Sequence, residues 1–229
     1  MRFSENEMVF FNSITSGAHV PELELHFTCS GEHKEEVKNT LIGLINKGVL
    51  ADETRLKEEG VLAAKAFEDY KLANRHVVIN NLRIAVTPVD SVVIIPFDKH
   101  EFELTRMPGT VIMMALLKQY DILREGSYYY PTDVSFVSVE KLLLHEIVDR
   151  DKAIRVKEIA DNQINSDCIY YWTECEVYKY DLQMQVKKAI DPVVIRHDIA
   201  KMLRLEEERG DGQQYGKWNN RLVYKRSQR

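Results

Sequence analysis

VVINNLRIAVTPVDSVVIIPFDKHEFELTRMPGTVIMMALLK, residues 77–118, is the segment around which the rest of the sequence is arranged. Three apolar or alternating runs in it, separated by polar turns, are typical of strands. They are Val77–Thr87, Val92–Phe97 and Glu101–Leu104. Pro108-Gly109-Thr110 then opens an apolar helix over Val111–Leu117. Strands followed by a returning helix predict a half-buried sheet with a helix on one face.

Local helix signals define the N-terminal side of this segment. Ser4 and Glu7 stand three residues apart and can form a capping box at the start of a first helix. Phe3 and Met8 are placed as the hydrophobic staple of the same helix. The remaining elements expected here are a short strand at Glu22–Phe27 and helices at His33–Asn46 and Glu53–Tyr70.

The C-terminal side repeats the same order after a break at Glu125–Asp133. Ser138 is expected to cap a new helix, and Asp191-Pro192 opens a last one. The segments between them are expected to form a short helix at Ile154–Ile164 and strands at Ile169–Trp172, Glu176–Tyr180 and Leu182–Val186. Each half therefore reads as a Ser-capped helix, strands and a Pro-started helix, which makes an ancient duplication plausible.

The predicted organisation is an N-terminal half, residues 1–126, and a C-terminal half, residues 127–205, within one compact domain. Residues 206–229 come after it as a loop and a basic tail. Apolar residues are interleaved with the basic ones from residue 217 onward, and they include Trp218, Leu222 and Val223. This interleaving favours a terminal strand or hairpin packed on the body over a nucleic-acid-binding arm.

Composition limits the class of protein. In 229 residues, 45% are hydrophobic and 29% charged, which is ordinary for a globular chain. The net charge of -5 gives no overall attraction for nucleic acid or anionic lipid. Neither a signal peptide nor an apolar run of about 20 residues is present, so a cytoplasmic protein without stable membrane insertion is expected.

The cysteines and histidines predict no chemistry. Three cysteines do not suggest a disulfide framework, and Cys168 and Cys175 are expected as separate buried residues. The candidate metal ligands are His19, His26, His33 and Cys29, but their spacing matches no zinc pattern. No phosphate-binding loop or nucleophile elbow is found either. We therefore expect no catalytic residue, no cofactor and no metal.

Two segments are candidates for contact with a protein partner. The turn at Phe97–His100 could form a contact tip or simply close a hairpin. Three consecutive tyrosines precede Pro131 and cannot all face a core, so at least one is expected at an interface or in a packed linker. The candidate partner-binding residues are Phe97, Asp98, Lys99, His100, Tyr128, Tyr129 and Tyr130.

The segment Phe3–Phe11 resembles the opening helix of the EspG family, the cytosolic chaperones of type VII (ESX) secretion. Leu41–Leu50 and the helix, strands and Pro108 helix after it are similar to the next segments of that family. The helices at Ser138 and Asp191-Pro192 would belong to the second half. The similarity lies in segment order and hydrophobic pattern, and it extends from Met1 to about Leu205.

This resemblance implies an α+β fold, with a central, mostly antiparallel sheet flanked by helical bundles in two pseudo-symmetric halves. It also implies a non-enzymatic cytoplasmic chaperone. Such a protein binds a small helical secreted protein or pair, keeps it soluble and delivers it for export. The family's contact residues do not transfer to individual positions here.

Two alternatives remain open. The helices on either side of Asn46–Leu50 also resemble part of a winged-helix DNA-binding unit, although the second helix carries several carboxylates that phosphates would repel. An enzyme with an unrecognised site between the two halves is the other alternative.

Overall fold

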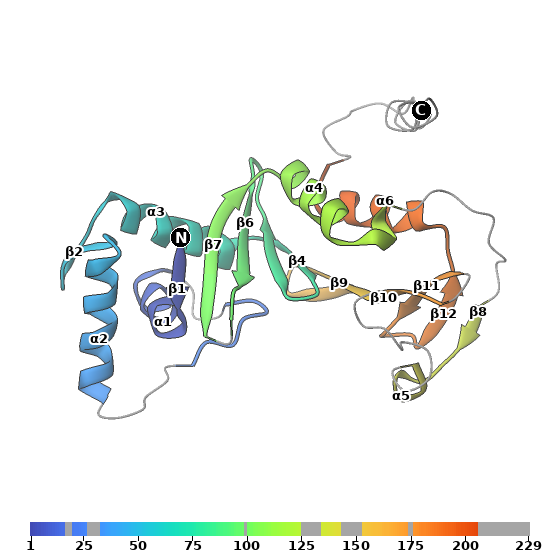
Figure 1. The fold of residues 1–229 in the computed structure, drawn as a ribbon, viewed down its shortest axis with the longest axis horizontal. Coiled ribbons are helices and arrows are strands. Elements are labelled where there is room, and N and C mark those ends of the chain that lie inside the picture. The colour runs from blue at the N-terminus through green and yellow to red at the C-terminus, as the bar shows by residue number, and fades with distance from the viewer. Residues whose placement is uncertain are drawn as a thin grey trace, which may run out of the picture.

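A computed structural model of the chain describes residues 1–16, 20–26, 33–98, 100–124, 134–142, 153–173 and 176–205. Over these ranges the fold is α+β, with one ten-stranded antiparallel sheet, a small two-stranded hairpin and several helices (Figure 1). No helix in the described ranges has both the length and the apolar character needed to cross a membrane.

The secondary structure is bounded by these residues. The large sheet contains β1 (Arg2–Ser4), β4 (Arg75–Ile79), β5 (Leu82–Val86), β6 (Ser91–Pro96), β7 (Glu101–Met107), β8 (Val134–Phe136), β9 (Ala153–Ala160), β10 (Gln163–Trp172), β11 (Val177–Asp181) and β12 (Val186–Ala189). The small hairpin contains β2 (Leu50–Asp52) and β3 (Arg55–Leu56). The helices are α1 (Glu5–Ile14), α2 (His33–Asn46), α3 (Glu58–Leu72), α4 (Gly109–Gln119), the 3₁₀ helix η1 (Asp121–Leu123), α5 (Val139–Lys141) and α6 (Pro192–Met202).

The order of the large sheet is β1-β7-β6-β5-β4-β9-β10-β11-β12-β8. The five strands from residues 2–107 lie on one side of the β4–β9 pair, and the five from residues 134–189 lie on the other. In this pair Arg75 is opposite Ala160 and Ile79 is opposite Val156. The molecule is elongated, with α1, α2 and α3 near the β1 end and α5 near the β8 end (Figure 1).

Helices cover both faces of the sheet in its N-terminal part. Successive side chains of a strand point to opposite faces, so Val93 packs in the core cluster that contains α4 and α6. Val92 and Ile94 pack in the cluster that contains α1, α2 and α3. Burial on both faces explains the unbroken apolar run of β6, and it corrects the prediction of a helix on one face only.

The predicted helix caps are confirmed. The Ser4 backbone N–H donates to the Glu7 carboxylate at 2.7 Å, and the Glu7 N–H donates to Ser4 Oγ at 3.3 Å. Ser138 caps α5 by accepting from the Lys141 N–H, and Asp191 caps α6 by accepting from the Val193 N–H at 2.8 Å. These caps satisfy backbone donors that a helix start otherwise leaves unpaired.

The expected helix at Ile154–Ile164 is wrong. These residues form β9 and the start of β10, and β9 is hydrogen-bonded to β4 on one side and β10 on the other. Ile154 and Val156 are fully buried, while Arg155 between them is exposed. This period of two marks a strand, and its partner strand β4 lies far away in the sequence.

Three other boundaries also differ from the predictions. Val77–Thr87 is two strands, because Asn80 takes a left-handed conformation (φ 52°) that turns the chain between β4 and β5. Residues 182–185 form a turn before β12, with the backbone N–H groups of 183 and 184 donating to Asp181 Oδ1 at 2.9 Å each. Residues 20–26 contain a turn and no strand, and Phe27 lies outside the described residues.

The expected helix at Glu53–Tyr70 begins later, at Glu58, because the β2–β3 hairpin occupies residues 50–56. The Asp52 carboxylate closes this hairpin by accepting from the Thr54 backbone and hydroxyl at 3.0 and 2.8 Å. Gly60 lies in the first turn of α3, directly against the carbonyl of Val49. Gly60 is therefore a point of close contact between α3 and Val49, the residue just before β2.

We expect Gly60→Ala to lower the free energy of unfolding by about 2–3 kcal/mol, the upper range for overpacking a buried site. The reason is that an added Cβ would lie 2.2 Å from the Val49 carbonyl oxygen, which is backbone and cannot rotate away. Urea denaturation followed by circular dichroism measures the change. Leu62→Ala on the same helix is the control, because Leu62 is 64% exposed. Equal stability of the two variants would contradict this account of Gly60.

Candidate functional site

The turn between β6 and β7 contains the predicted contact residues Phe97, Asp98 and His100, whereas Lys99 lies outside the described residues. Asp98 organises the turn because its Oδ1 accepts from the backbone N–H groups of His100 and Glu101 at 2.8 and 2.9 Å. The Phe97 N–H donates to the Glu101 carbonyl at 2.8 Å. These hydrogen bonds join the two sides of the turn through Asp98, as expected for an Asp-closed loop.

The start of α1 holds this turn in place. The Glu5 N–H donates to the His100 carbonyl at 2.9 Å, and His100 Nδ1 lies 3.3 Å from the Glu5 carboxylate. The Arg2 guanidinium lies over the Phe97 ring, 3.5 Å from its centroid. Phe97 nevertheless remains 56% exposed, so an aromatic surface is presented to solvent at the end of β6.

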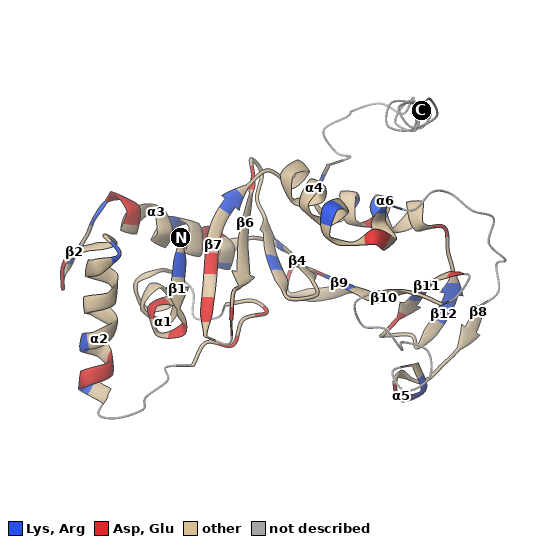
Figure 2. Cartoon of the chain, in the orientation of Figure 1, with Lys and Arg blue, Asp and Glu red and all other residues tan. Residues whose placement is uncertain are grey.

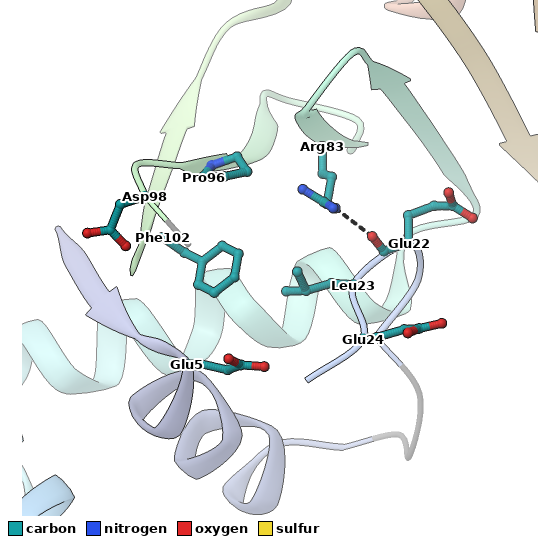
Figure 3. A pocket seen from close by; sticks show the side chains of 8 residues that line it. All are labelled: Glu5, Glu22, Leu23, Glu24, Arg83, Pro96, Asp98 and Phe102. Atoms are coloured by element: carbon teal, nitrogen blue, oxygen red, sulfur yellow. Dashed lines mark hydrogen bonds between the residues drawn. The ribbon is translucent and has the colours of Figure 1, made fainter. Parts of the chain in front are cut away.

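A cavity of about 580 Å³ opens beside the turn (Figure 3). Phe102 and Leu23 point toward each other inside it, and carboxylates and one guanidinium stand around them (Figure 3). The lining residues are Glu5, Glu22, Leu23, Glu24, Arg83, Pro96, Asp98 and Phe102. The cavity therefore has an apolar floor and a mostly acidic rim.

The charge of the rim is negative because its four carboxylate residues outnumber its one guanidinium, that of Arg83. Arg83 donates from Nε to the Glu22 carbonyl and from Nη1 to the Asn81 carbonyl at 3.0 Å. Strand β7 carries acidic residues as well (Figure 2), but Glu101 and Glu103 alternate with Phe102, so their side chains point to the other face of the sheet. A cationic group flanked by apolar atoms is the complementary ligand chemistry for such a surface.

Glu22 is the residue that joins this cavity to the second half of the sheet. Its backbone is left-handed (φ 57°), an uncommon conformation for a residue other than glycine. Its carboxylate accepts from Lys157 Nζ of β9 at 2.9 and 3.0 Å. The Tyr70 hydroxyl donates to the adjacent Pro21 carbonyl at 2.9 Å, and burial raises the pKa of Tyr70, which keeps this donor protonated.

A second cavity of about 200 Å³ shares Glu22 and Arg83 with the first. Arg155 and Lys157 of β9 line it together with Val78 and Asn80. Arg155 makes a two-point ion pair with Asp167, at 2.9 and 2.6 Å. Arg155 and Lys157 are therefore both ion-paired, and these positions of β9 do not form a free basic patch.

The sequence profile of a domain of unknown function, DUF5081, matches residues 1–127, which is more than half of the chain. The chain belongs to the DUF5081 family. No curated protein matches it. The DUF5081 region contains every residue that lines the larger cavity, and the smaller cavity adds Arg155 and Lys157 from beyond it.

The other residues singled out from the sequence lie elsewhere. Tyr128, Tyr129, Tyr130, His19, Cys29 and Cys175 lie outside the described residues. His26 lies 3.9 Å from the exposed Glu24 carboxylate. The described ranges of this DUF5081 chain contain no group of His, Cys, Asp and Glu side chains that could hold a metal ion.

The sequence analysis missed Glu22, Arg83 and Lys157. Pro21 signals a turn at Glu22, but nothing local indicates that this turn meets β5 and β9. Arg83 interrupts an apolar strand, which is the one local sign of a polar contact on that face.

A double-mutant cycle with Glu22→Gln and Lys157→Met should give a coupling energy of about 1–2 kcal/mol, because both side chains are largely shielded from solvent. The exposed fractions are 29% for Glu22 and 16% for Lys157. Chemical denaturation of the four chains measures the coupling. The control pair, Asp52–Arg55, is 54% and 74% exposed and 3.7 Å apart. Its coupling should stay below about 0.5 kcal/mol, and a coupling as small for Glu22–Lys157 would contradict their role as a link.

Cys168 is expected to resist alkylation in the folded chain. It is 3% exposed, and burial raises the pKa of its thiol to about 11. Only roughly 0.1% is then thiolate at pH 8, so we expect iodoacetamide to label it about 100-fold more slowly than in the urea-unfolded chain. Peptide mapping by mass spectrometry tracks this one cysteine. Equal labelling rates in the folded and unfolded chains would show that Cys168 is accessible.

Proposed function

We propose that this chain is a cytoplasmic, non-enzymatic chaperone or adaptor for type VII secretion, of the kind that its resemblance to the EspG family implies. Its client would be a small helical secreted protein or pair, held soluble until export. The observation that carries the proposal is the order of elements in the two parts of the chain.

That order is the same on both sides of the β4–β9 pair. Outward from the pair, the strands run β4-β5-β6-β7-β1 on one side and β9-β10-β11-β12-β8 on the other. In each part the outermost strand comes first and leads into a Ser-capped helix, at Ser4 and at Ser138. Four consecutive strands and a helix opened by proline come next, at Pro108 and at Pro192.

This repeated order supports a pseudo-symmetric two-half architecture of EspG type. In such a duplication, α2, the β2–β3 hairpin and α3 are an insert in the first half between α1 and β4. Insertions accumulate where a repeat can vary without losing its core. The match to DUF5081 ends at residue 127, which is also the first residue of the predicted second half.

The surface near the β6–β7 turn supplies contacts that suit a protein client. Phe97 is an exposed aromatic residue at the end of β6, and aromatic residues are enriched at protein interfaces. The acidic cavity beside it complements a lysine or arginine that projects from a client helix. We therefore place the client contact at Phe97, Asp98 and His100.

The test is to purify the tagged chain from its native cytoplasm, with and without nuclease, and to identify co-eluting proteins by mass spectrometry. We expect a small helical protein or pair in stoichiometric amount that nuclease does not remove. Phe97→Asp should lower its recovery at least tenfold, since hot-spot side chains are typically worth about 2 kcal/mol or more.

Val89→Asp is the matched control for the client test, because Val89 is a 92% exposed apolar residue in the β5–β6 turn, at the opposite end of β6. It should leave the recovery of the client unchanged. A chain that elutes alone, or whose partners disappear with nuclease, would sink the chaperone proposal. Equal losses for the two variants would remove the client contact from the β6–β7 turn.

A further inference from the structure

The β1 edge of the large sheet is occupied by side chains of the same chain. Alternate residues of an antiparallel strand direct their backbone N–H and C=O groups away from the neighbouring strand. In β1 these are Arg2 and Ser4, because the Met1 carbonyl accepts from β7 at 3.0 Å. The Ser4 N–H donates to the Glu7 carboxylate at 2.7 Å. The Arg2 carbonyl accepts from Lys47 Nζ at 3.2 Å, so a further strand could pair with β1 only by displacing these contacts.

Strand β8 is the last strand at the other end of the sheet (Figure 1). The Val137 N–H, directly after β8, donates to the Gln185 carbonyl before β12 at 3.1 Å. By the same alternation, Val134 and Phe136 direct their backbone N–H and C=O groups away from β12. No strand of the described residues pairs with this outer side, and Val134 and Phe136 are 57% and 83% exposed. An exposed apolar edge of this kind is a template for another strand.

The side chains of β8 indicate which strand would fit. Val134 and Phe136 project from one face of the sheet and Ser135 from the other. The neighbouring strand β12 places the exposed Lys188 beside Val134. It places the half-buried Val186 beside Phe136. Because β8 itself has no charged residue, an added strand gains most from an aromatic residue opposite Val134 and a β-branched residue opposite Phe136.

Strand β8 is complementary to itself in this respect. When two copies of β8 run antiparallel about a two-fold axis at Ser135, each Val134 lies opposite the Phe136 of the other copy. Both residues direct their backbone groups outward, so this pair exchanges both of its N–H···O bonds. Ser135 then faces its own copy in a non-hydrogen-bonded pair. The same patch serves both subunits, as in the two-fold dimers that are the commonest oligomers.

We infer that β8 is a dimerisation edge, through which two copies of this chain join their sheets antiparallel about Ser135. A second copy is favoured over a flexible peptide because its β8 is already ordered, so pairing costs little chain entropy. The occupied β1 edge prevents further addition, and the assembly therefore closes with two chains. The inference does not rest on the proposed function, because β8 and the β6–β7 turn lie in opposite parts of the sheet.

The association is measured by sedimentation velocity of the full chain. The strands are short and bury a small interface, so we expect a weak dimer, with a Kd of roughly 10–100 μM. Concentrations from about 5 to 500 μM cover this range. Phe136→Lys should raise the Kd at least about tenfold, because a charged edge residue opposes strand pairing. Val89→Lys is the matched control and should leave the Kd unchanged, since Val89 is a 92% exposed apolar residue in the β5–β6 turn.

Disulfide cross-linking tests the register. The background chain has Cys29 and Cys175 replaced by serine, and Cys168 stays because it is 3% exposed. Ser135→Cys should give a disulfide-linked dimer, since facing residues of a non-hydrogen-bonded pair have Cα atoms about 4.5 Å apart, within disulfide range. Val134→Cys should cross-link severalfold more slowly, because its own copy lies two positions further along the strand.

Three results would overturn the inference. The first is a chain that stays monomeric over the whole concentration range, which would leave β8 to an extended segment of another protein. The second is a dimer that Phe136→Lys does not weaken. The third is equal cross-linking of the two cysteine variants, which would exclude the axis at Ser135. Circular dichroism checks folding, and Val134→Lys replaces Phe136→Lys if that variant does not fold.

Discussion

The pairing of β4 with β9 is the contact on which the rest of the structure depends. It is the one place in the described sheet where strands of the first and second parts of the chain are hydrogen-bonded. Val77 and Ile79 of β4 and Ile154 and Val156 of β9 are buried together beneath α4 and α6. Asn80 extends the pairing, since its N–H donates to the Arg155 carbonyl at 2.9 Å and its side-chain oxygen accepts from the Arg155 N–H at 2.8 Å.

Features encoded by neighbouring residues could be predicted from the sequence. The capping box at Ser4 and the proline start of α6 each need only a few consecutive residues, and both predictions are confirmed. The turn at Phe97–His100 results from one aspartate between two strands. By contrast, the buried residues of β9 also fit a helical pattern over a short window, and only the distant strand β4 decides in favour of a strand.

In the candidate site, too, some residues could be predicted from local sequence signals and others could not. Phe97 and Asp98 could be predicted because a polar turn between strands is a local signal. Glu22 and Lys157 could not, because 135 positions separate them and their ion pair depends on how the 20–26 segment crosses the finished sheet. A single sequence shows which side chains are charged, but it does not show which of them meet across strands that are distant in the chain.

The central pair also has a consequence for biosynthesis. When β4 leaves the ribosome, residues 80–152 must still be made before β9 exists. At roughly 5–20 residues per second this takes about 4–15 s, during which β4 is the unprotected border of a partly built sheet. Such a border can pair with any other extended chain, so a nascent copy on the same messenger is its nearest competitor. Until the second part of the chain is made, the unpaired edge of β4 is a surface that a chaperone could bind and protect.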